Sequence, residues 1–225
     1  MDTGTGTADA FARFARGGTL SRLTRLKVDE CVKLPSGCGT CLPALAAMDI
    51  VSIHGPIDWP SLAACSTVTS LKARFYSRIL WGNDVIAWPG FKQLRRLHYG
   101  IVPIPACGLL GLSALTQLVL EDGGRLPSSI SSLAALCELQ IDSAKDLDLQ
   151  ALAALSQLTK LTVSGQWPIV GAFGWDALSG LRQLRELSIS ADPGVRMPVL
   201  APAVQELQRL ELQWMELEGV RIRLL

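Results

Sequence analysis

The apolar residues of this chain recur with a rhythm that fits neither a helix nor a single strand. In the segment LSALTQLVL, residues 112–120, leucines are separated by steps of three, three and two. An amphipathic helix alternates steps of three and four, and a half-buried strand takes steps of two. The final L-x-L therefore predicts a short strand with two inward side chains. The two steps of three predict a corner that leads the chain into that strand.

The block L-x-x-L-x-x-L-x-L returns along the chain, with substitutions. Its first residues are Leu20, Leu42, Cys65, Phe91, Leu112, Leu133, Leu155, Leu181 and Val204. Successive copies begin 21 to 26 residues apart, and a copy of that size cannot bury its own leucines without stacking on its neighbours. Parallel strands need a return path of about a dozen residues, which this period supplies. The pattern predicts an α/β solenoid: a curved arc with a parallel β-sheet on its concave face, and short helices, 3₁₀ turns and loops on its convex face.

The return paths and the chain ends differ from the blocks. We expect a short helix in each of 125–136 and 147–158, the first capped by Ser128 or Ser129. Residues 1–17 are predicted to be a disordered start and an N-terminal cap. Residues 18–225 are predicted to be one repeat domain of about nine repeats, closed by a thin cap strand at 220–224. A cap this thin is what we expect of a chain that continues in a longer protein.

In block and period, the sequence resembles the leucine-rich repeat family over residues 18 to about 215. The copy LPSSISSLAALCELQI, residues 126–141, is most similar to the intracellular type of plant and algal proteins. The resemblance implies a scaffold that binds another protein on its concave sheet or rim, without catalysis or cofactor. One departure stands out: eight residues after the second leucine of each block, where the family has Asn or Cys, only Cys31 matches. An asparagine ladder is therefore not expected.

Net charge, apolar runs and cysteine content indicate which partners and which cellular compartment to expect. The formal net charge is +1, so no global field attracts nucleic acid or an anionic membrane. No apolar run reaches the roughly 18 residues of a membrane span, and the start of the chain lacks the apolar core of a secretory signal. Six cysteines are spread through a chain too large to need disulfide staples. We expect a cytoplasmic protein, monomeric unless it belongs to a longer chain.

Two alternatives stay open beside the scaffold. The C-x-x-C pair of Cys38 and Cys41 has the spacing of thiol-redox and zinc sites, but it lies between glycines and does not open a long helix. Metal ligation would also need two further ligands. The second alternative is a fragment of a larger intracellular scaffold, of the immune-receptor-like or ciliary kind.

The candidate protein-binding residues follow from the strand pattern, because residues between the inward leucines face outward. The basic candidates in blocks one to four are Arg25, Lys27, Lys72, Arg74, Arg96 and His98. The acidic candidates in blocks five to nine are Glu121, Glu138, Asp142, Glu186 and Glu211. With Asp29, Asp49, Lys160 and Arg209 included, the formal sums are +3 and −3, which predicts a concave face polarised along the arc. Trp81 and Trp167, in the two longest repeats, are candidate aromatic contacts on the rim.

Overall fold

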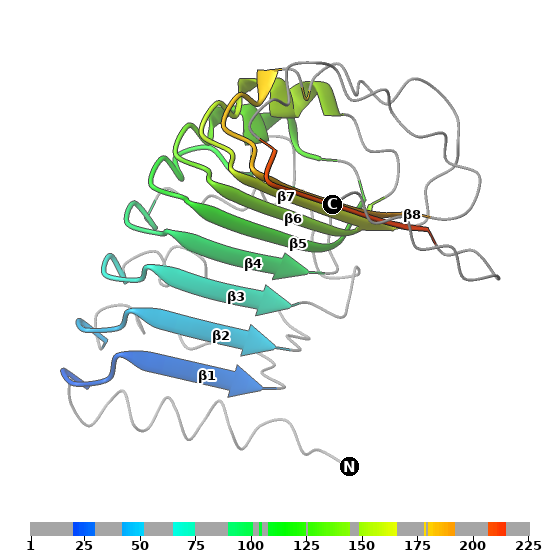
Figure 1. The fold of residues 1–225 in the computed structure, drawn as a ribbon. Helices are drawn as coiled ribbons and strands as arrows, with labels where there is room; N and C mark the ends of the chain where they lie inside the picture. The colour runs from blue at the N-terminus through cyan, green and yellow to red at the C-terminus, as the bar shows by residue number, and fades with distance from the viewer. Residues whose placement is uncertain are drawn as a thin grey trace, which may run out of the picture.

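The computed structural model describes residues 20–29, 42–51, 65–74, 90–100, 104, 108–124, 126–144, 149–165, 178, 180–191 and 207–214. These residues form a nine-stranded parallel sheet whose strands follow one another in chain order, as the steps of an arc (Figure 1). The strands are β1 (Arg25–Asp29), β2 (Ala47–Val51), β3 (Ser70–Arg74), β4 (Arg96–Gly100), β5 (Gln117–Gly124), β6 (Glu138–Ala144), β7 (Lys160–Gly165), β8 (Glu186–Ala191) and β9 (Arg209–Trp214). The predicted solenoid is confirmed.

The strands align by equivalent repeat positions. Leu97 on β4 is paired with Leu118 on β5, and Leu118 with Leu139 on β6. The side chains of these leucines are at most 1% exposed, and the same holds for Leu161 and Leu187 farther along the sheet. The third and fourth residues of the block therefore point inward and stack as a ladder, as the L-x-L spacing predicts. A one-residue slip would turn the whole set outward.

The corner before each strand is a tight turn. The N–H of the second block residue donates to the carbonyl of the first, as from Leu23 to Leu20 (3.1 Å) and from Leu115 to Leu112 (3.0 Å), and the same bond recurs before every strand from β1 to β8. The carbonyl just ahead of one strand then accepts two N–H groups from the next repeat. Thr24 O, for example, accepts from Ala46 and Ala47 at 2.9 and 3.0 Å. The polar backbone groups at the strand starts are thus bonded between neighbouring repeats.

The two return paths expected to hold helices contain 3₁₀ helices, η1 (Ser128–Ser132) and η2 (Leu149–Ala154). The serine cap expected for the first is wrong: Pro127 occupies the N-cap position, and no side chain caps the helix. Ser129 is 6% exposed, and its hydroxyl accepts the N–H of Leu109 at 3.1 Å. The helix begins at Ser128, so both serines lie inside it and not at its N-cap position, and the hydroxyl of Ser129 is directed to the preceding repeat.

Several predicted features lie outside the described residues. These are the N-terminal cap in 1–17, the closing strand at 220–224, the Cys38 and Cys41 pair, and the two tryptophans Trp81 and Trp167. The division into cap and repeat domain therefore stays a prediction.

Candidate binding face

The outward strand residues form three rows across the concave face. The entry row, nearest the strand starts, holds Arg25, Ala47, Ser70, Arg96, Gln117, Glu138, Lys160, Glu186 and Arg209. The middle row holds Lys27, Asp49, Lys72, His98, Val119, Gln140, Thr162, Ser188 and Glu211. The exit row holds Asp29, Val51, Arg74, Gly100, Glu121, Asp142, Ser164 and Ser190. All the charged candidates from the sequence fall in these rows.

The centre of the face holds a cluster that joins three strands. Glu121 on β5 lies 2.6 Å from His98 Nε2 through one carboxylate oxygen and 3.2 Å from Arg74 Nε through the other. The Arg74 N–H is not aligned for a hydrogen bond, so this contact is an ion pair. The three side chains are between 24% and 30% exposed. Glu121 belongs to the predicted acidic half of the arc and Arg74 to the basic half. The cluster therefore partly neutralises the charges where the two halves meet.

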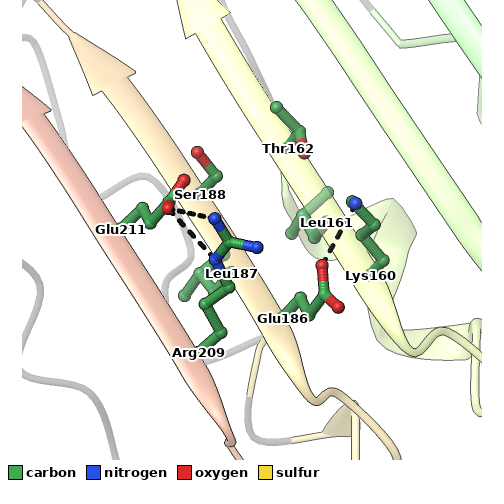
Figure 2. A pocket seen from close by; sticks show the side chains of 8 residues that line it. All are labelled: Lys160, Leu161, Thr162, Glu186, Leu187, Ser188, Arg209 and Glu211. Carbon is green, nitrogen blue, oxygen red and sulfur yellow. Dashed lines mark hydrogen bonds and ion pairs between the residues drawn. The ribbon is translucent and has the colours of Figure 1, made fainter. Parts of the chain in front are cut away.

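The strands β7 to β9 carry a shallow hollow of about 220 Å³. Figure 2 shows its two ion pairs: Lys160 with Glu186 at 3.1 Å between neighbouring strands, and Arg209 with Glu211 at 2.6 Å along β9. The hydrogen bond from Arg209 to Glu211 raises the pKa of Arg209. Thr162 and Ser188 also line the hollow. Short hydroxyl side chains flanked by long charged ones leave room there for a hydrogen-bonding group of a ligand.

The remaining charged residues of the face divide into paired and unpaired ones. Lys27 lies 2.8 Å from Asp29, and this hydrogen bond raises the pKa of Lys27. Glu138 accepts a hydrogen bond from Gln117, and Asp142 accepts bonds from Gln140 and Ser164. Within the described residues, the face cations without an ion-pair partner are Arg25, Lys72 and Arg96.

Three of the basic candidates, Lys72, Arg74 and Arg96, lie on the adjacent strands β3 and β4 but are spread over the face. The register places Arg96 in the entry row, Lys72 in the middle row and Arg74 in the exit row. Arg74 is also engaged by Glu121, so it is not a free cation. The sequence interpretation did not single out Gly100, Thr162 or Ser188. Small residues at outward strand positions were the signal that could have located the cluster and the hollow.

The described thiols and carboxylates do not assemble into a metal site. The part of the chain that the structure describes contains no group of three or more His, Cys, Asp or Glu side chains placed to hold an ion. Cys65 and Cys137 are free thiols, and burial raises the pKa of Cys65. Within the same residues, no helix is long and apolar enough to cross a membrane.

No protein-family model matches the chain, and comparison with curated proteins gives no match either. Internalin C2 from Listeria monocytogenes is similar in structure, with a TM-score of 0.61 and 20% identity over 85% of this chain and 80% of that one. The TLR13–ssRNA13 complex gives a TM-score of 0.57 and 17% identity, over 92% of this chain and 34% of that one. This chain thus spans about a third of TLR13. At these identities the likeness establishes the fold: the chain is a leucine-rich repeat solenoid.

Proposed function

We propose that this chain is a non-catalytic scaffold that binds a partner protein on the concave face or its rim. The observation that carries the proposal is the continuous outward surface of nine aligned strands, on which exposed charged groups accompany a hollow. TLR13 has the same fold and is solved with an RNA bound, so solenoids of this architecture hold other macromolecules. The cytoplasmic location and the plant and algal repeat type belong to this proposal, and the free thiols of Cys65 and Cys137 support a reducing compartment.

The residues proposed to contact the partner differ in the interactions that they can form. Arg25, Lys72 and Arg96 have no ion-pair partner among the described residues, so a partner carboxylate meets no competing anion there. The cations of the hollow are already paired with Glu186 and Glu211. A ligand group in the hollow is therefore best held by hydrogen bonds to Thr162 and Ser188. Trp81 and Trp167 are the proposed contacts if the partner uses the rim.

A bulky side chain in the hollow tests the proposal. Thr162→Trp places an indole on the outward face of β7 without touching the inward leucines. Ser131→Trp, on the exposed surface of η1, adds the same side chain to the convex side. Both variants should unfold at a similar denaturant concentration. A partner captured by the wild type and by Ser131→Trp, but not by Thr162→Trp, supports concave binding. Equal capture by all three contradicts it.

A further inference from the structure

The edge of the sheet where the strands begin carries a large excess of positive charge. We define the entry edge as the entry row together with the outward residues of the turn before each strand. Among the described residues it holds nine lysines and arginines against two carboxylates, Glu138 and Glu186. Seven of the nine cations are exposed and have no ion-pair partner among those residues: Arg22, Arg25, Lys92, Arg95, Arg96, Arg182 and Arg185.

The rest of the face has the opposite sign. The middle and exit rows hold the carboxylates of Asp29, Asp49, Glu121, Asp142 and Glu211 against the cations Lys27, Lys72 and Arg74. Four residues separate the entry row from the exit row, which is about 13 Å along a strand. The charge of this face therefore changes along the strands, from positive at their starts to negative at their ends. The sequence predicted a charge gradient along the arc, from one strand to the next. The gradient in the structure runs at right angles to that direction, along the strands.

The unpaired cations of the entry edge are grouped at three strands. Arg22 and Arg25 lie at β1; Lys92, Arg95 and Arg96 lie at β4; and Arg182 and Arg185 lie at β8. Three and four strand spacings separate these groups, or about 14 and 19 Å at 4.8 Å per strand. Between these groups, the edges of β2, β3 and β5 offer only uncharged alanine, serine, threonine, proline and glutamine, whereas those of β6 and β7 carry Glu138 and Lys160. Figure 1 shows the strand starts aligned along one border of the sheet, so the three groups share one edge.

We propose that the entry edge docks an acidic segment of a partner protein, which crosses the strands with carboxylates opposite β1, β4 and β8. This inference rests on the proposed function, because it names the chemistry of the partner that the scaffold binds. Six of the seven unpaired cations are arginines, whose planar guanidinium binds a carboxylate with two parallel hydrogen bonds. The exit-row carboxylates repel the same segment from the opposite side of the face, which fixes its position.

A protein segment fits this edge better than a nucleic acid does. Proteins that bind single strands combine basic grooves with aromatic side chains on which bases stack. The outward residues of the entry edge that the structure describes include no aromatic side chain. Phosphates also follow one another at short, regular intervals, so those over the uncharged strands would find no cation. Carboxylates can instead be spaced freely along a peptide.

The test uses synthetic peptides on the whole chain. In an extended peptide at about 3.3 Å per residue, the two intervals correspond to about four and six residues. The matched peptide carries three pairs of glutamates at those intervals in a Gly-Ser-Ala background, and the control peptide has all its glutamates consecutive. Fluorescence anisotropy at low salt should show about fivefold tighter binding of the matched peptide, because three separate groups are engaged at once. Equal affinity of the two peptides, or absence of binding, overturns the proposal.

Two charge-matched variants locate the binding. Arg95→Gln with Arg185→Gln removes two entry-edge cations, and Ser131→Glu with Ala154→Glu lowers the net charge by the same amount on the 3₁₀ helices, away from the concave face. The first should weaken the matched peptide about tenfold, and the second less than about twofold, because rim charges act over short, screened distances. An equal loss in both variants overturns the proposal. So does a single-stranded oligothymidylate of equal charge that binds the entry edge more tightly than the peptide.

Failure of this inference and failure of the proposed function give different results. A partner that Thr162→Trp excludes but that binds the Arg95→Gln, Arg185→Gln variant normally leaves the concave scaffold intact and overturns the acidic-segment proposal. A partner unaffected by Thr162→Trp contradicts concave binding whatever the peptides do. Circular dichroism of each variant shows that the comparison is made on folded protein.

Discussion

Glu121 reaches Arg74 across an intervening strand, with 3.2 Å between its Oε2 and the Nε of Arg74. The two residues lie on β5 and β3, and Gly100 on β4 stands between them in the exit row. A Cβ at Gly100 would come within 2.9 Å of Glu121 Oε2 and 3.2 Å of Glu121 Cβ. Because glycine has no side chain, the carboxylate can lie over β4 and contact two strands at once.

Gly100→Ala should separate Glu121 from Arg74. The flexible end of Glu121 can swing away from the new methyl group, so the cost is the lost contact and a small readjustment. We expect a fall in the free energy of unfolding of about 1 kcal/mol, the upper range for partly exposed pairs. Denaturant titration measures it. In a Glu121→Ala background the same substitution should cost clearly less, and an equal cost would show that Gly100 matters for some other reason.

Leu118→Ala should destabilise the fold strongly, because the side chain of Leu118 is fully buried between its equivalents on β4 and β6. A large-to-small change in a packed core costs about 2–5 kcal/mol. Gln117→Ala is the matched control, since it removes one partly exposed hydrogen bond to Glu138 and should cost under about 1 kcal/mol. Similar losses in the two titrations would contradict the register of β5.

The leucine spacing was sufficient to predict the strands, their order and which side chains face inward. Each inward residue of β5, such as Leu118, is buried by its equivalents in the next repeats, so the repeat in sequence is the repeat in space. The start of the first 3₁₀ helix was harder to predict, because the side chain of Ser129 accepts a hydrogen bond from the backbone N–H of Leu109 in the preceding repeat. Local capping preferences do not include such a distant partner.

The ion pairs between strands could not be predicted, because they depend on neighbours from different repeats. When formal charges are summed along the arc, Glu121 and Arg74 fall in opposite halves. The strand register and the missing side chain of Gly100 bring the two residues together. The turn cations of the entry edge, such as Arg95, were not among the sequence candidates, because the strand pattern selects only the residues next to the inward leucines of each strand. Their grouping becomes visible once the turns are aligned on one edge.

Alkaline pH should weaken the fold through Tyr99. Its side chain is 1% exposed, and burial raises the pKa of its phenol well above the ordinary value of 10.0. Because the pKa is higher in the folded than in the unfolded chain, the contribution to stability is complete below pH 10 and declines as the pH rises above it. Unfolding midpoints measured from pH 8 to pH 11 should fall more steeply for the wild type than for Tyr99→Phe. Parallel slopes would contradict a buried phenol.

The Cys38 and Cys41 pair decides the alternative of a thiol-redox or zinc protein. We expect these cysteines to be reduced and structural, so Cys38→Ser with Cys41→Ser should keep the circular dichroism spectrum and the partner binding of the wild type. Metal analysis and thiol titration of both proteins provide the measurement. Stoichiometric zinc that disappears in the double variant, or a reversible disulfide between the pair, would replace the scaffold interpretation with the alternative.

The unpaired cations of the concave face should govern how fast a partner associates. Arg74 is best left unchanged, because its replacement would also release Glu121 and confuse binding with local structure. Lys72→Gln with Arg96→Gln removes two charges that have no ion-pair partner among the described residues. Long-range attraction acts mainly on the association rate. We therefore expect that rate to fall about tenfold at low ionic strength.

The control for this pair adds two negative charges elsewhere. Ser131→Glu with Ala154→Glu alters the 3₁₀ helices of the convex side and changes the net charge by the same amount. If attraction is local to the concave face, the control should associate nearly as fast as the wild type. The difference between the two variants should shrink as salt rises, because the screening length is about 10 Å at 0.1 M. Equal rates for both variants at every salt concentration would mean that the whole-molecule charge, and not this face, steers the partner.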